Sequence, residues 1–376
     1  MKKKCFSDIL TELSDDGPAR MRRKVPEWAE VPGIEFPSRL ATEQCSSSAT
    51  AAYKASLVRR ISPECGFLAD LTGGLGVDCF FFSRVCGQVL YNEMDATLAD
   101  AVKRNFSLLG VSNVSFSSLE VTPESLPELV SGGPDIIYLD PARRSGTGRK
   151  VFLLEDCSPD LTALRDSLLA AAPDILAKLS PMADIAMVLR RLGDTVREMH
   201  VVGTDGECKE LLVWMHRGWS GGCTIVAEGL RFTAQEEAAA HPRLLPDRLA
   251  FAGTLFEPSA TLLKAGCFNL LCDRLGLYKL GRSTHLYLAE TPDERLKQYG
   301  KVFSIMEVLP FNGLSIKTLG KSMPRCGVTA RNLPISSDAL ARKMGVTPGG
   351  DAHVFAFTAD FAGAPSERLM AVTERA

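Results

Sequence analysis

Short apolar runs alternate with amphipathic stretches between residues 67 and 216. Continuous apolar runs bounded by turn residues are typical of strands buried on both faces, whereas apolar residues three and four positions apart are typical of helices with one buried face. The pattern predicts helices at 77–85, 96–110 and 182–192. It predicts strands at 67–71, 88–91, 111–116, 135–139, 173–178, 196–202 and 210–216.

The order of these segments predicts the architecture of this part of the chain. Five strands alternate with helical segments, which is the order that produces a parallel sheet covered by helices on both faces. The last two strands are joined only by Gly203-Thr204-Asp205-Gly206, a link too short for a crossover helix, so they pair antiparallel. We therefore predict an α/β fold with a doubly wound, seven-stranded sheet, in which one edge strand is reversed.

The first predicted strand ends in a glycine-rich turn, Asp70-Leu71-Thr72-Gly73-Gly74-Leu75-Gly76. Glycine tolerates positive φ and allows a ligand to approach the backbone closely. The helix that follows such a turn presents free amide groups and the positive end of its dipole. The turn therefore predicts a nucleotide-type pocket at the carboxyl end of the first strand.

An acidic residue follows the second predicted strand. Glu93 stands 20 residues after Gly73, close to the offset at which a carboxylate meets ribose hydroxyls in dinucleotide-binding folds. A carboxylate suits this role because it accepts two hydrogen bonds at once from a vicinal diol. The alternative is that Glu93 only caps the next helix, but Asp95 is the better cap candidate. We therefore expect Glu93 to hold a ribose.

Composition shifts divide the chain into four predicted regions. They are a helical N-terminal segment (1–66), the doubly wound sheet (67–217), a linker with a helical extension (218–275) and a basic α+β region (276–376). In the first region, 40–61 is predicted to be a serine-capped helix with Ala49, Ala52, Tyr53 and Leu57 at helical spacing. Between Gly276 and Gly345, basic residues outnumber acidic ones eleven to five.

The overall composition narrows the class of protein. The chain has 376 residues, of which 45% are hydrophobic and 23% charged, as expected for a globular protein of two or three domains. Its net charge of −2 predicts no global attraction to nucleic acid, so such binding must depend on a local patch.

The eleven cysteines and five histidines are dispersed, without the C-x-x-C spacing of a zinc site, so we expect no metal. No apolar run has the length of a membrane span and no cleavage signal follows the basic start, so we expect a soluble, cytoplasmic protein.

Four motifs taken together resemble a known family. They are D-L-T-G-G-L-G-V-D at 70–78, Asn92-Glu93, A-V-K-R-N-F-S-L-L-G-V-S-N-V at 101–114 and D-I-I-Y-L-D-P-A-R-R at 135–144. From about Ser46 to His216 the chain is similar to the class I S-adenosylmethionine-dependent methyltransferases. It looks closest to the branch that modifies nucleic-acid bases, such as the trimethylguanosine-synthase-like and THUMP-containing RNA methyltransferases. The resemblance implies a Rossmann-like methyltransferase sheet and S-adenosyl-L-methionine as the cofactor.

The end of the chain resembles a second domain of the same proteins. The run T-A-R-N-L-P-I-S-S-D-A-L-A-R-K-M-G-V-T-P-G-G-D-A-H-V-F-A-F at 329–357 is similar to the THUMP-like carboxyl-terminal domain found beside such a catalytic domain, here after a ferredoxin-like segment. THUMP domains are RNA-binding modules. The resemblance therefore implies an RNA partner, tRNA or rRNA, held through the basic C-terminal region, and an enzyme of RNA modification.

The family's motifs imply cofactor-binding roles for matching positions. The residues that would surround the amino-acid part of the cofactor are Asp70, Thr72, Gly73, Gly74 and Gly76, with Asp140 bordering it. Glu93 would hold the ribose, and Met94 would pack on the adenine. Gln44 and Ser46, before the first strand, would close the site.

The family's D/N-P-P-Y/F/R motif shapes the methyl-acceptor pocket, and Asp140, Pro141 and Arg143 stand at its positions. Ala142 replaces the second proline, and Arg143 replaces the aromatic residue that often stacks on a target base. A D-P-P-R variant belongs to enzymes that methylate carbon 5 of pyrimidines, using a cysteine after the fifth strand. Here that strand ends in Lys178-Leu179-Ser180-Pro181, so covalent activation by a thiolate is not expected there.

Methyl transfer from a sulfonium depends mainly on the proximity and orientation of an in-line nucleophile. For an exocyclic amine, Asp140 would accept a hydrogen bond and help to remove the proton, while Arg143 and Arg144 would hold a phosphate or a base edge. Two alternatives stay open at this point. One is a non-catalytic RNA-binding protein that keeps a methyltransferase fold. The other is an NAD-dependent oxidoreductase, although the turn has Gly74-x-Gly76-x-x-Cys79 in place of G-x-G-x-x-G/A.

Overall fold

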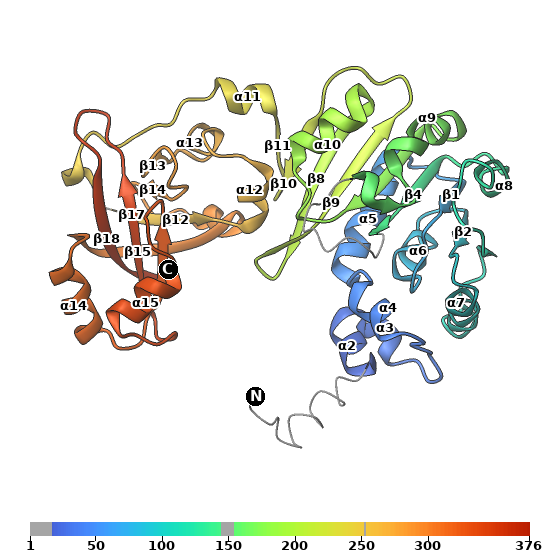
Figure 1. Ribbon diagram of the computed structural model, residues 1–376, viewed down its shortest axis with the longest axis horizontal. Helices are drawn as coiled ribbons and strands as arrows, with labels where there is room; N and C mark the ends of the chain where they lie inside the picture. Colours follow the sequence, from blue (N-terminus) through green and yellow to red (C-terminus); the bar gives the residue numbers. More distant parts are fainter. Residues whose placement is uncertain (1–16, 144–153, 252) are drawn as a thin grey trace. The chain divides into compact units, whose positions relative to one another are not determined.

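The computed structural model describes residues 17–143, 154–251 and 253–376 (Figure 1). Within these ranges the chain forms two compact units. Unit 1 comprises residues up to Thr204 together with Lys209–Cys223, and unit 2 comprises Asp205–Cys208 together with Thr224–Ala376. Each unit encloses hydrophobic core clusters of its own.

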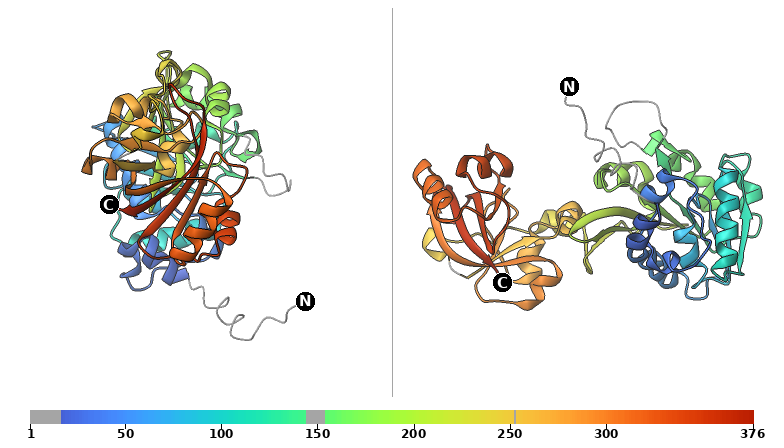
Figure 2. Two further views of the ribbon diagram at one scale, coloured as in Figure 1. Left: turned by 90° about the vertical axis from the view of Figure 1, so that its left-hand side faces the viewer. Right: turned by 90° about the horizontal axis from the view of Figure 1, so that it is seen from below.

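The strands of unit 1 follow the order β8-β9-β7-β4-β1-β2-β3 in a mostly parallel arrangement. The strands are β1 (Phe67–Asp70), β2 (Gln88–Asn92), β3 (Val114–Ser117), β4 (Ile136–Leu139), β7 (Asp174–Leu179), β8 (Val196–Thr204) and β9 (Glu207–His216). β1 pairs in parallel with β2 and β4, β2 with β3, and β4 with β7, whereas β9 is antiparallel to β7. Helices cover both faces of this sheet (Figure 2), so the predicted doubly wound α/β fold with a reversed last strand is confirmed.

The place of the reversed strand differs from the prediction. β9 lies between β7 and β8 and is not an edge strand. The chain leaves β7 through α10 (Ile185–Leu192), forms β8 one position further out, and returns through a tight turn into the gap. The sequence shows only that β8 and β9 form a hairpin. Which strand of the hairpin bonds to β7 depends on where the crossover helix delivers the chain.

The helices of unit 1 enclose an aromatic core. They are α2 (Gly17–Lys24), α3 (Pro26–Ala29), α4 (Arg39–Gln44), α5 (Ser48–Ile61), α6 (Val77–Phe82), α7 (Ala96–Leu108), α8 (Leu126–Leu129), α9 (Leu161–Ala171) and α10. The Trp28 ring is fully buried and lies edge-on to Phe80 and Phe106, with ring centroids 5.5 and 6.2 Å away. Such edge-to-face contacts add to the gain from burying the rings, so the N-terminal helices are anchored to α6 and α7.

Of the four residues predicted at helical spacing on α5, only Leu57 is buried. The predicted helix at 40–61 is broken at Cys45, and Ser47 caps α5 by accepting a hydrogen bond from the Thr50 amide. Ala49, Ala52 and Tyr53 are exposed. The residues that α5 buries are Thr50, Ala51, Lys54, Ala55, Leu57 and Val58. The buried stripe contains a charged residue, Lys54, whose partners come from elsewhere in the fold.

Unit 2 begins with an antiparallel hairpin of β10 (Thr224–Ala227) and β11 (Leu230–Thr233), followed by α11 (Ala234–Ala239). Its main sheet has the order β13-β14-β12-β15-β18-β17-β16. The strands are β12 (Thr254–Pro258), β13 (Tyr278–Lys279), β14 (Tyr287–Ala289), β15 (Gly300–Pro310), β16 (Gly327–Arg331), β17 (Ala352–Ala359) and β18 (Glu367–Arg375). β16 pairs in parallel with β17 and the other neighbours pair antiparallel, which confirms the predicted C-terminal α+β architecture.

Strand β17 of unit 2 is buried on both faces along most of its length. Successive side chains of a strand point to opposite faces, and along β17 both sets are apolar. Val354 and Ala356 pack in one cluster with residues of α14 (Gly313–Ser322) and α15 (Ser337–Met344). Phe355 and Phe357 pack in a second cluster with residues of β12, β14 and β15. α12 (Ala260–Ala265) and α13 (Leu270–Leu275) follow β12 in the chain.

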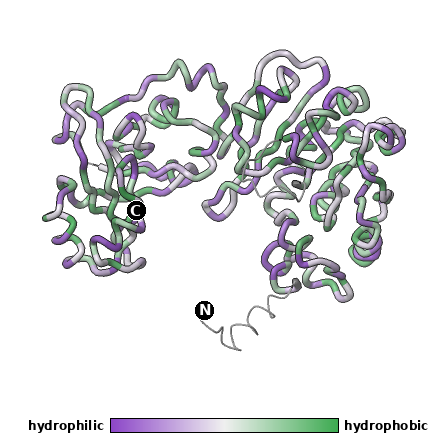
Figure 3. The backbone as a smooth tube through the Cα atoms, in the orientation of Figure 1, coloured by the Kyte–Doolittle hydropathy of each residue, from purple (hydrophilic) through white to green (hydrophobic). Residues whose placement is uncertain are grey.

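Hydrophobic residues are frequent along the strands (Figure 3). Among the helices of the described ranges, none is long and apolar enough to cross a membrane. The same part of the chain contains no group of three or more His, Cys, Asp or Glu side chains that could hold a metal ion.

The packing of α14 on α15 can be tested at Gly320. A Cβ at this position would lie 1.9 Å from the Met344 carbonyl oxygen, a contact that no side-chain rotation relieves. We expect Gly320→Ala to destabilise unit 2 by about 1–3 kcal/mol through overpacking, measured as a lower midpoint of urea denaturation. Gly313→Ala, on the same helix, is the matched control, because its Cβ would meet no atom within 4 Å. Equal midpoints for the two variants would contradict the close approach of the two helices.

Candidate functional site

The glycine-rich turn after β1 is held in shape by residues of β2. The Gly73 amide donates to the Asn92 carbonyl oxygen at 2.7 Å, and the Tyr91 hydroxyl donates to the Gly74 carbonyl oxygen at 2.5 Å. A Cβ on Gly73 would lie 2.2 Å from the Tyr91 ring, so only glycine fits there. Gly74 and Gly76 have φ values of +53° and +81°, in the left-handed region that favours glycine. The turn therefore has its shape before any ligand binds.

Glu93 supports the turn from the end of β2. Its Oε2 accepts a hydrogen bond from the Gly74 amide at 2.9 Å, and its Oε1 accepts one from the Asp95 amide at 3.0 Å. Asp95 caps α7, as predicted, because its Oδ1 accepts from the amides of Thr97 and Leu98. Each carboxylate oxygen of Glu93 keeps a lone pair that can accept from a further donor. The Glu93 carboxylate can therefore bind vicinal hydroxyls while it holds the turn.

Asp70, the last residue of β1, is fully buried and has one engaged oxygen. Its Oδ1 accepts from the Thr72 amide at 3.1 Å, whereas its Oδ2 is buried without a hydrogen-bond partner within the part of the chain that the structure describes. Burial, and then the neighbouring Asp78, Asp140 and Glu93 carboxyls, hold the pKa of Asp70 well above its usual range. A buried, partly unsatisfied carboxyl among other acids suits a cationic ligand group, because the cation would satisfy the oxygen and offset the cost of charge burial.

Thr72 connects the turn to the loop after β4. Its Oγ1 accepts from the Asp140 amide at 2.6 Å, and the Oδ2 of Asp140 accepts from the Lys178 ammonium on β7 at 2.5 Å. The Lys178 side chain is 15% exposed and the Asp140 side chain is 37% exposed. Burial lowers the pKa of Lys178, but Asp140, Asp78 and Glu210 raise it more, so the ammonium keeps its charge. A permanently charged partner thus orients a carboxylate that reaches solvent.

A buried charge network joins α5, α6, β4 and β9. The fully buried Lys54 ammonium contacts both carboxylate oxygens of Glu210 at 3.0 and 3.1 Å, Asp78 Oδ1 at 3.0 Å and the Ser46 hydroxyl at 2.8 Å. Asp78 Oδ2 accepts from the hydroxyls of Tyr138 and Ser46 at 2.8 and 2.9 Å. Buried charges are tolerated only when they are paired and hydrogen-bonded in this way.

Lys54 and Lys178 set the ionisation of this network. Burial raises the pKa of Asp78, but the two lysines lower it more, so it lies below its usual range. Burial also raises the pKa of Glu210, and the same lysines offset this only in part, so it lies above its usual range. The charge balance near the turn therefore depends on both cations.

Three further residues, Gln44, Ser46 and Met94, were predicted to bind the cofactor. Gln44 ends α4 and is exposed. Ser46 lies outside the helix in which it was predicted, and it is buried in the charge network. Met94 directly follows Glu93, and its side chain is 63% exposed. An exposed thioether offers apolar surface on which a planar ring can pack.

The residues predicted for the methyl acceptor follow β4. Pro141 comes directly after Asp140, and Arg143 belongs to β5 (Ala142–Arg143), which pairs antiparallel with β6 (Cys157–Ser158). The sequence pattern did not predict this small sheet, because two-residue strands have no periodicity. Arg144, also predicted for the acceptor, lies outside the described residues.

Sequence reasoning did not identify Lys54, Lys178 or Tyr91 as part of this site. The two lysines did leave a signal, because each interrupts a run that is otherwise apolar, and lysine is almost never fully buried unless it is paired. Lys178 lies within the buried strand D-I-L-A-K-L, and Lys54 lies on the buried face of α5. Tyr91 left none, since a tyrosine in a buried strand is ordinary.

The chemistry of these residues fits S-adenosylmethionine. Asp70 offers an unsatisfied buried oxygen to a cationic group, and Glu93 offers acceptors to ribose hydroxyls. A Cβ on Gly74 would meet no atom within 4 Å, so the backbone of the turn is open on that side. These residues stay candidates for cofactor binding.

Two family models match the C-terminal part of the chain. A ferredoxin-like domain matches residues 255–295, and a THUMP domain-like model matches residues 300–375. Comparison with curated proteins gave no match.

The chain is also similar to solved structures. One is a candidate methyltransferase from Porphyromonas gingivalis W83, which is 33% identical, covers 96% of this chain and 88% of its own, and superposes with a TM-score of 0.83. An rRNA methylase from Streptococcus thermophilus is 13% identical over 46% of this chain and 98% of its own, with a TM-score of 0.34. A tRNA methyltransferase from Aquifex aeolicus is 13% identical over 49% of this chain and 72% of its own, also at 0.34. The last two scores are too low to support an argument.

The buried Asp70 carboxyl is predicted to lower the stability of the protein at neutral pH while it contributes to ligand binding. Since its pKa is raised in the folded state, the wild type loses stability as pH rises above about 4, where the unfolded chain ionises. We expect Asp70→Asn to be about as stable as the wild type near pH 4 and more stable at pH 8, measured by urea denaturation, with weaker binding of S-adenosylmethionine. Asp100→Asn, exposed on α7, is the control. A variant less stable than the wild type at pH 8 would show that the Asp70 charge is compensated within the protein.

Proposed function

The chain belongs to the class I S-adenosylmethionine-dependent methyltransferases that carry a THUMP-like C-terminal domain, and on that basis we propose that it methylates a base in RNA, either tRNA or rRNA. The observation that carries the proposal is the arrangement of Asp70, a buried carboxyl with an unsatisfied oxygen, and Asp140, a carboxylate oriented by Lys178, at adjacent strand ends. The cofactor, when bound, supplies an electrophilic methyl group on a sulfonium.

The turn side of the site holds the donor. Asp70 would hold a cationic group of the amino-acid part through Oδ2, and Glu93 would accept hydrogen bonds from the ribose hydroxyls. Because the turn is already fixed by Tyr91 and Glu93, little conformational entropy is lost when the donor binds. Most of the rate enhancement in such a transfer comes from this fixed geometry.

The β4 side of the site holds the acceptor. Lys178 engages Oδ2 of Asp140, which leaves Oδ1 to accept a hydrogen bond from the exocyclic amine of a base. The nitrogen would form its bond to the methyl carbon as the bond from that carbon to the sulfonium sulfur breaks, which leaves a neutral thioether. The nitrogen then loses a proton, and the Asp140 carboxylate takes it directly or through water. The Thr72 hydroxyl accepts a hydrogen bond from the Asp140 amide, and this bond fixes the position of the turn relative to the loop after β4.

The replacement of the family's second proline by Ala142 coincides with a small antiparallel sheet at this position. Ala142 pairs with Ser158 in the β5–β6 ladder, at the position where the family pattern has its second proline. Proline has no N–H group and is disfavoured inside a ladder, so alanine permits this pairing. The departure therefore accompanies a different local backbone after Asp140, and Asp140 itself is retained.

The RNA assignment rests on the THUMP-like match at residues 300–375 and on the basic residues of the C-terminal region. Phosphate contacts by lysine and arginine release counterions, so we expect RNA affinity to fall steeply as salt rises. The test of function is mass spectrometry of nucleosides from RNA of a strain that lacks this protein, compared with wild type. A methylated nucleoside that is lost in the mutant, and restored in its RNA by the purified protein with S-adenosylmethionine, supports the proposal. RNA binding without any such change would indicate a non-catalytic RNA-binding protein.

Asp140→Asn tests the role of Asp140 as proton acceptor. The amide oxygen can still accept from Lys178, so the fold is kept, but the side chain loses its basicity. We expect methyl transfer to fall by about 10²–10⁴-fold, the usual contribution of a general base, with binding of S-adenosylhomocysteine within twofold of the wild type. Asp100→Asn serves as the matched control. Transfer at the wild-type rate would reject the assignment.

Glu93 variants test the ribose contact. We expect Glu93→Ala to weaken S-adenosylmethionine binding by roughly ten- to hundredfold, the loss typical of hydrogen bonds to a charged group. Glu93→Gln keeps one oxygen for the turn amides, so it should lose less affinity. Titration calorimetry measures both. Unchanged affinity in the alanine variant would count against the contact.

A further inference from the structure

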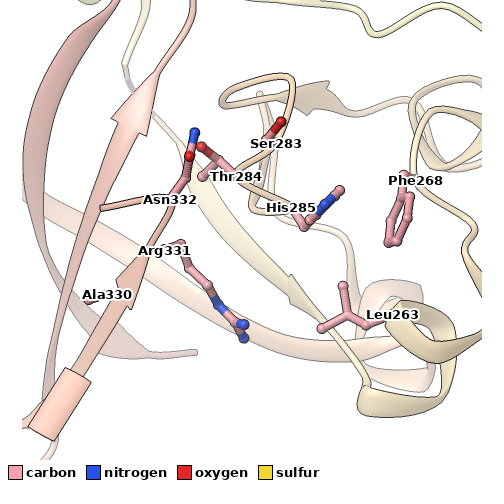
Figure 4. Close-up of a pocket in the computed structure, with 8 residues that line it drawn as sticks. All are labelled: Leu263, Phe268, Ser283, Thr284, His285, Ala330, Arg331 and Asn332. Carbon is pink, nitrogen blue, oxygen red and sulfur yellow. The ribbon is translucent and has the colours of Figure 1, made fainter. Parts of the chain in front are cut away.

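A cavity of about 400 Å³ lies in unit 2 (Figure 4). It is lined by Leu263, Phe268, Ser283, Thr284, His285, Ala330, Arg331 and Asn332. Its walls come from both matched regions, since the ferredoxin-like region supplies residues 263–285 and the THUMP-like region supplies residues 330–332. These segments lie near opposite edges of the sheet, because β16 is at one edge and β13 and β14 are at the other. Backbone and side-chain bonds from the loop before β14 to the end of β17 bring them together.

Two buried polar atoms at this cavity lack partners within the described ranges. They are Nδ1 of His285 and Nε of Arg331. Nη2 of Arg331 is bound to the Glu257 carboxylate at 2.9 Å, so the guanidinium is held in place while its Nε–H is left without an acceptor. In Figure 4 the Arg331 side chain extends from its strand toward the side of the cavity where His285 and Leu263 lie. An unpaired buried donor on a fixed guanidinium suits an anionic oxygen, since guanidinium groups match the geometry of phosphate.

The opposite wall offers flat apolar surface. The rings of Phe268 and His285 lie with their centroids 4.0 Å apart and their planes 31° apart, and Leu263 lies beside them. Burial, and then the cations Lys279 and Arg331, lower the pKa of His285, so the ring is neutral at pH 7. A neutral ring pair next to an aliphatic side chain packs well against a planar base.

The backbone of the cavity is strained at two positions. His285 and Asn332 both have φ of +53°, in the left-handed region that residues other than glycine rarely adopt. Strain of this kind persists where the surroundings impose it and clusters at ligand sites. Both residues line this cavity, one from each matched region.

We propose that this cavity, here called the Arg331 cavity, binds one nucleotide unit, with its phosphate on Arg331 and its base against Leu263, Phe268 and His285. Ser283 and Asn332 add polar groups at the rim. The nucleotide unit has two sources, a free nucleotide or a residue of RNA. The RNA source rests on the proposed function and would make the cavity the point at which unit 2 holds one nucleotide of its substrate.

The test uses the full chain saturated with S-adenosylhomocysteine, so that nucleotides are kept out of the methyl-donor site. Titration calorimetry with AMP, GMP, CMP and UMP, and with adenosine and inorganic phosphate, measures binding. We expect one equivalent of a monophosphate to bind, more tightly than adenosine or phosphate alone. We expect Arg331→Gln to weaken it by roughly ten- to hundredfold, the loss typical of a charged hydrogen bond. Arg342→Gln, exposed on α15, is the control and should bind as the wild type does.

A single-stranded RNA oligonucleotide of mixed sequence separates the two sources. Binding of RNA that is lost in Arg331→Gln, with no binding of monophosphates, assigns the cavity to RNA. Binding of monophosphates that RNA does not displace assigns it to a free nucleotide. Both results support a nucleotide site, whereas failure of both ligands to bind, or equal binding by wild type and Arg331→Gln, overturns it.

Arg331→Gln leaves the Glu257 carboxylate buried without its partner, so the variant can fail to fold. Arg331→Lys keeps the charge opposite Glu257 but loses Nε, and Phe268→Leu removes one ring, so these variants keep the test decisive. Thermal denaturation confirms that each is folded. S-adenosylhomocysteine affinity and methyl transfer are measured separately. Loss of nucleotide binding with unchanged S-adenosylhomocysteine affinity supports the cavity, whereas absent S-adenosylhomocysteine binding in the wild type bears only on the proposed function.

Discussion

Two lysines, the fully buried Lys54 and the largely buried Lys178, hold together the carboxyl edge of the sheet in unit 1. Lys54 reaches from α5 to Asp78 and Glu210, and Lys178 reaches from β7 to Asp140. Removing one partner of a buried ion pair typically costs about 3–5 kcal/mol, because the other charge stays buried and uncompensated. The acidic groups at this edge lie close together because these ammonium groups balance their charge. The fold and the candidate site therefore depend on the same charge balance.

The glycine-rich turn shows how this edge is prepared for a ligand. Three consecutive residues at the end of β2 hold it: Tyr91 through its hydroxyl, Asn92 through its carbonyl and side-chain amide, and Glu93 through its carboxylate. The polar groups of these three residues are hydrogen-bonded to the turn, whereas one carboxylate oxygen of Asp70 is buried without a partner among the residues described here. A rigid turn beside one unsatisfied acid is a common compromise at binding sites, where stability is given up for affinity.

Much of the architecture was determined by sequence patterns alone. The alternation of apolar runs and amphipathic helices predicted the doubly wound sheet, because both signals depend on local periodicity and on short connections. The spacing from Gly73 predicted that Glu93 belongs to the candidate site, and Asp95 was predicted to cap α7. Both relations lie within one β-α-β unit. The D-P-A-R motif indicated the strand end at which Asp140 lies. These features are close in sequence, so local rules sufficed.

Only the tertiary structure showed which distant groups meet. The sequence could not reveal that Lys54 pairs with Glu210, which is 156 positions away. Nor could it reveal that β9 lies between β7 and β8 in the sheet. It placed the exposed Ala49, Ala52 and Tyr53 at helical spacing on α5, because periodicity treats lysine as a surface residue unless its buried partners are known. The Arg331 cavity likewise combines segments about 50 residues apart, which no local pattern connects. Local propensity determines which elements form, whereas long-range burial of charge and ring surface decides which of their side chains act together.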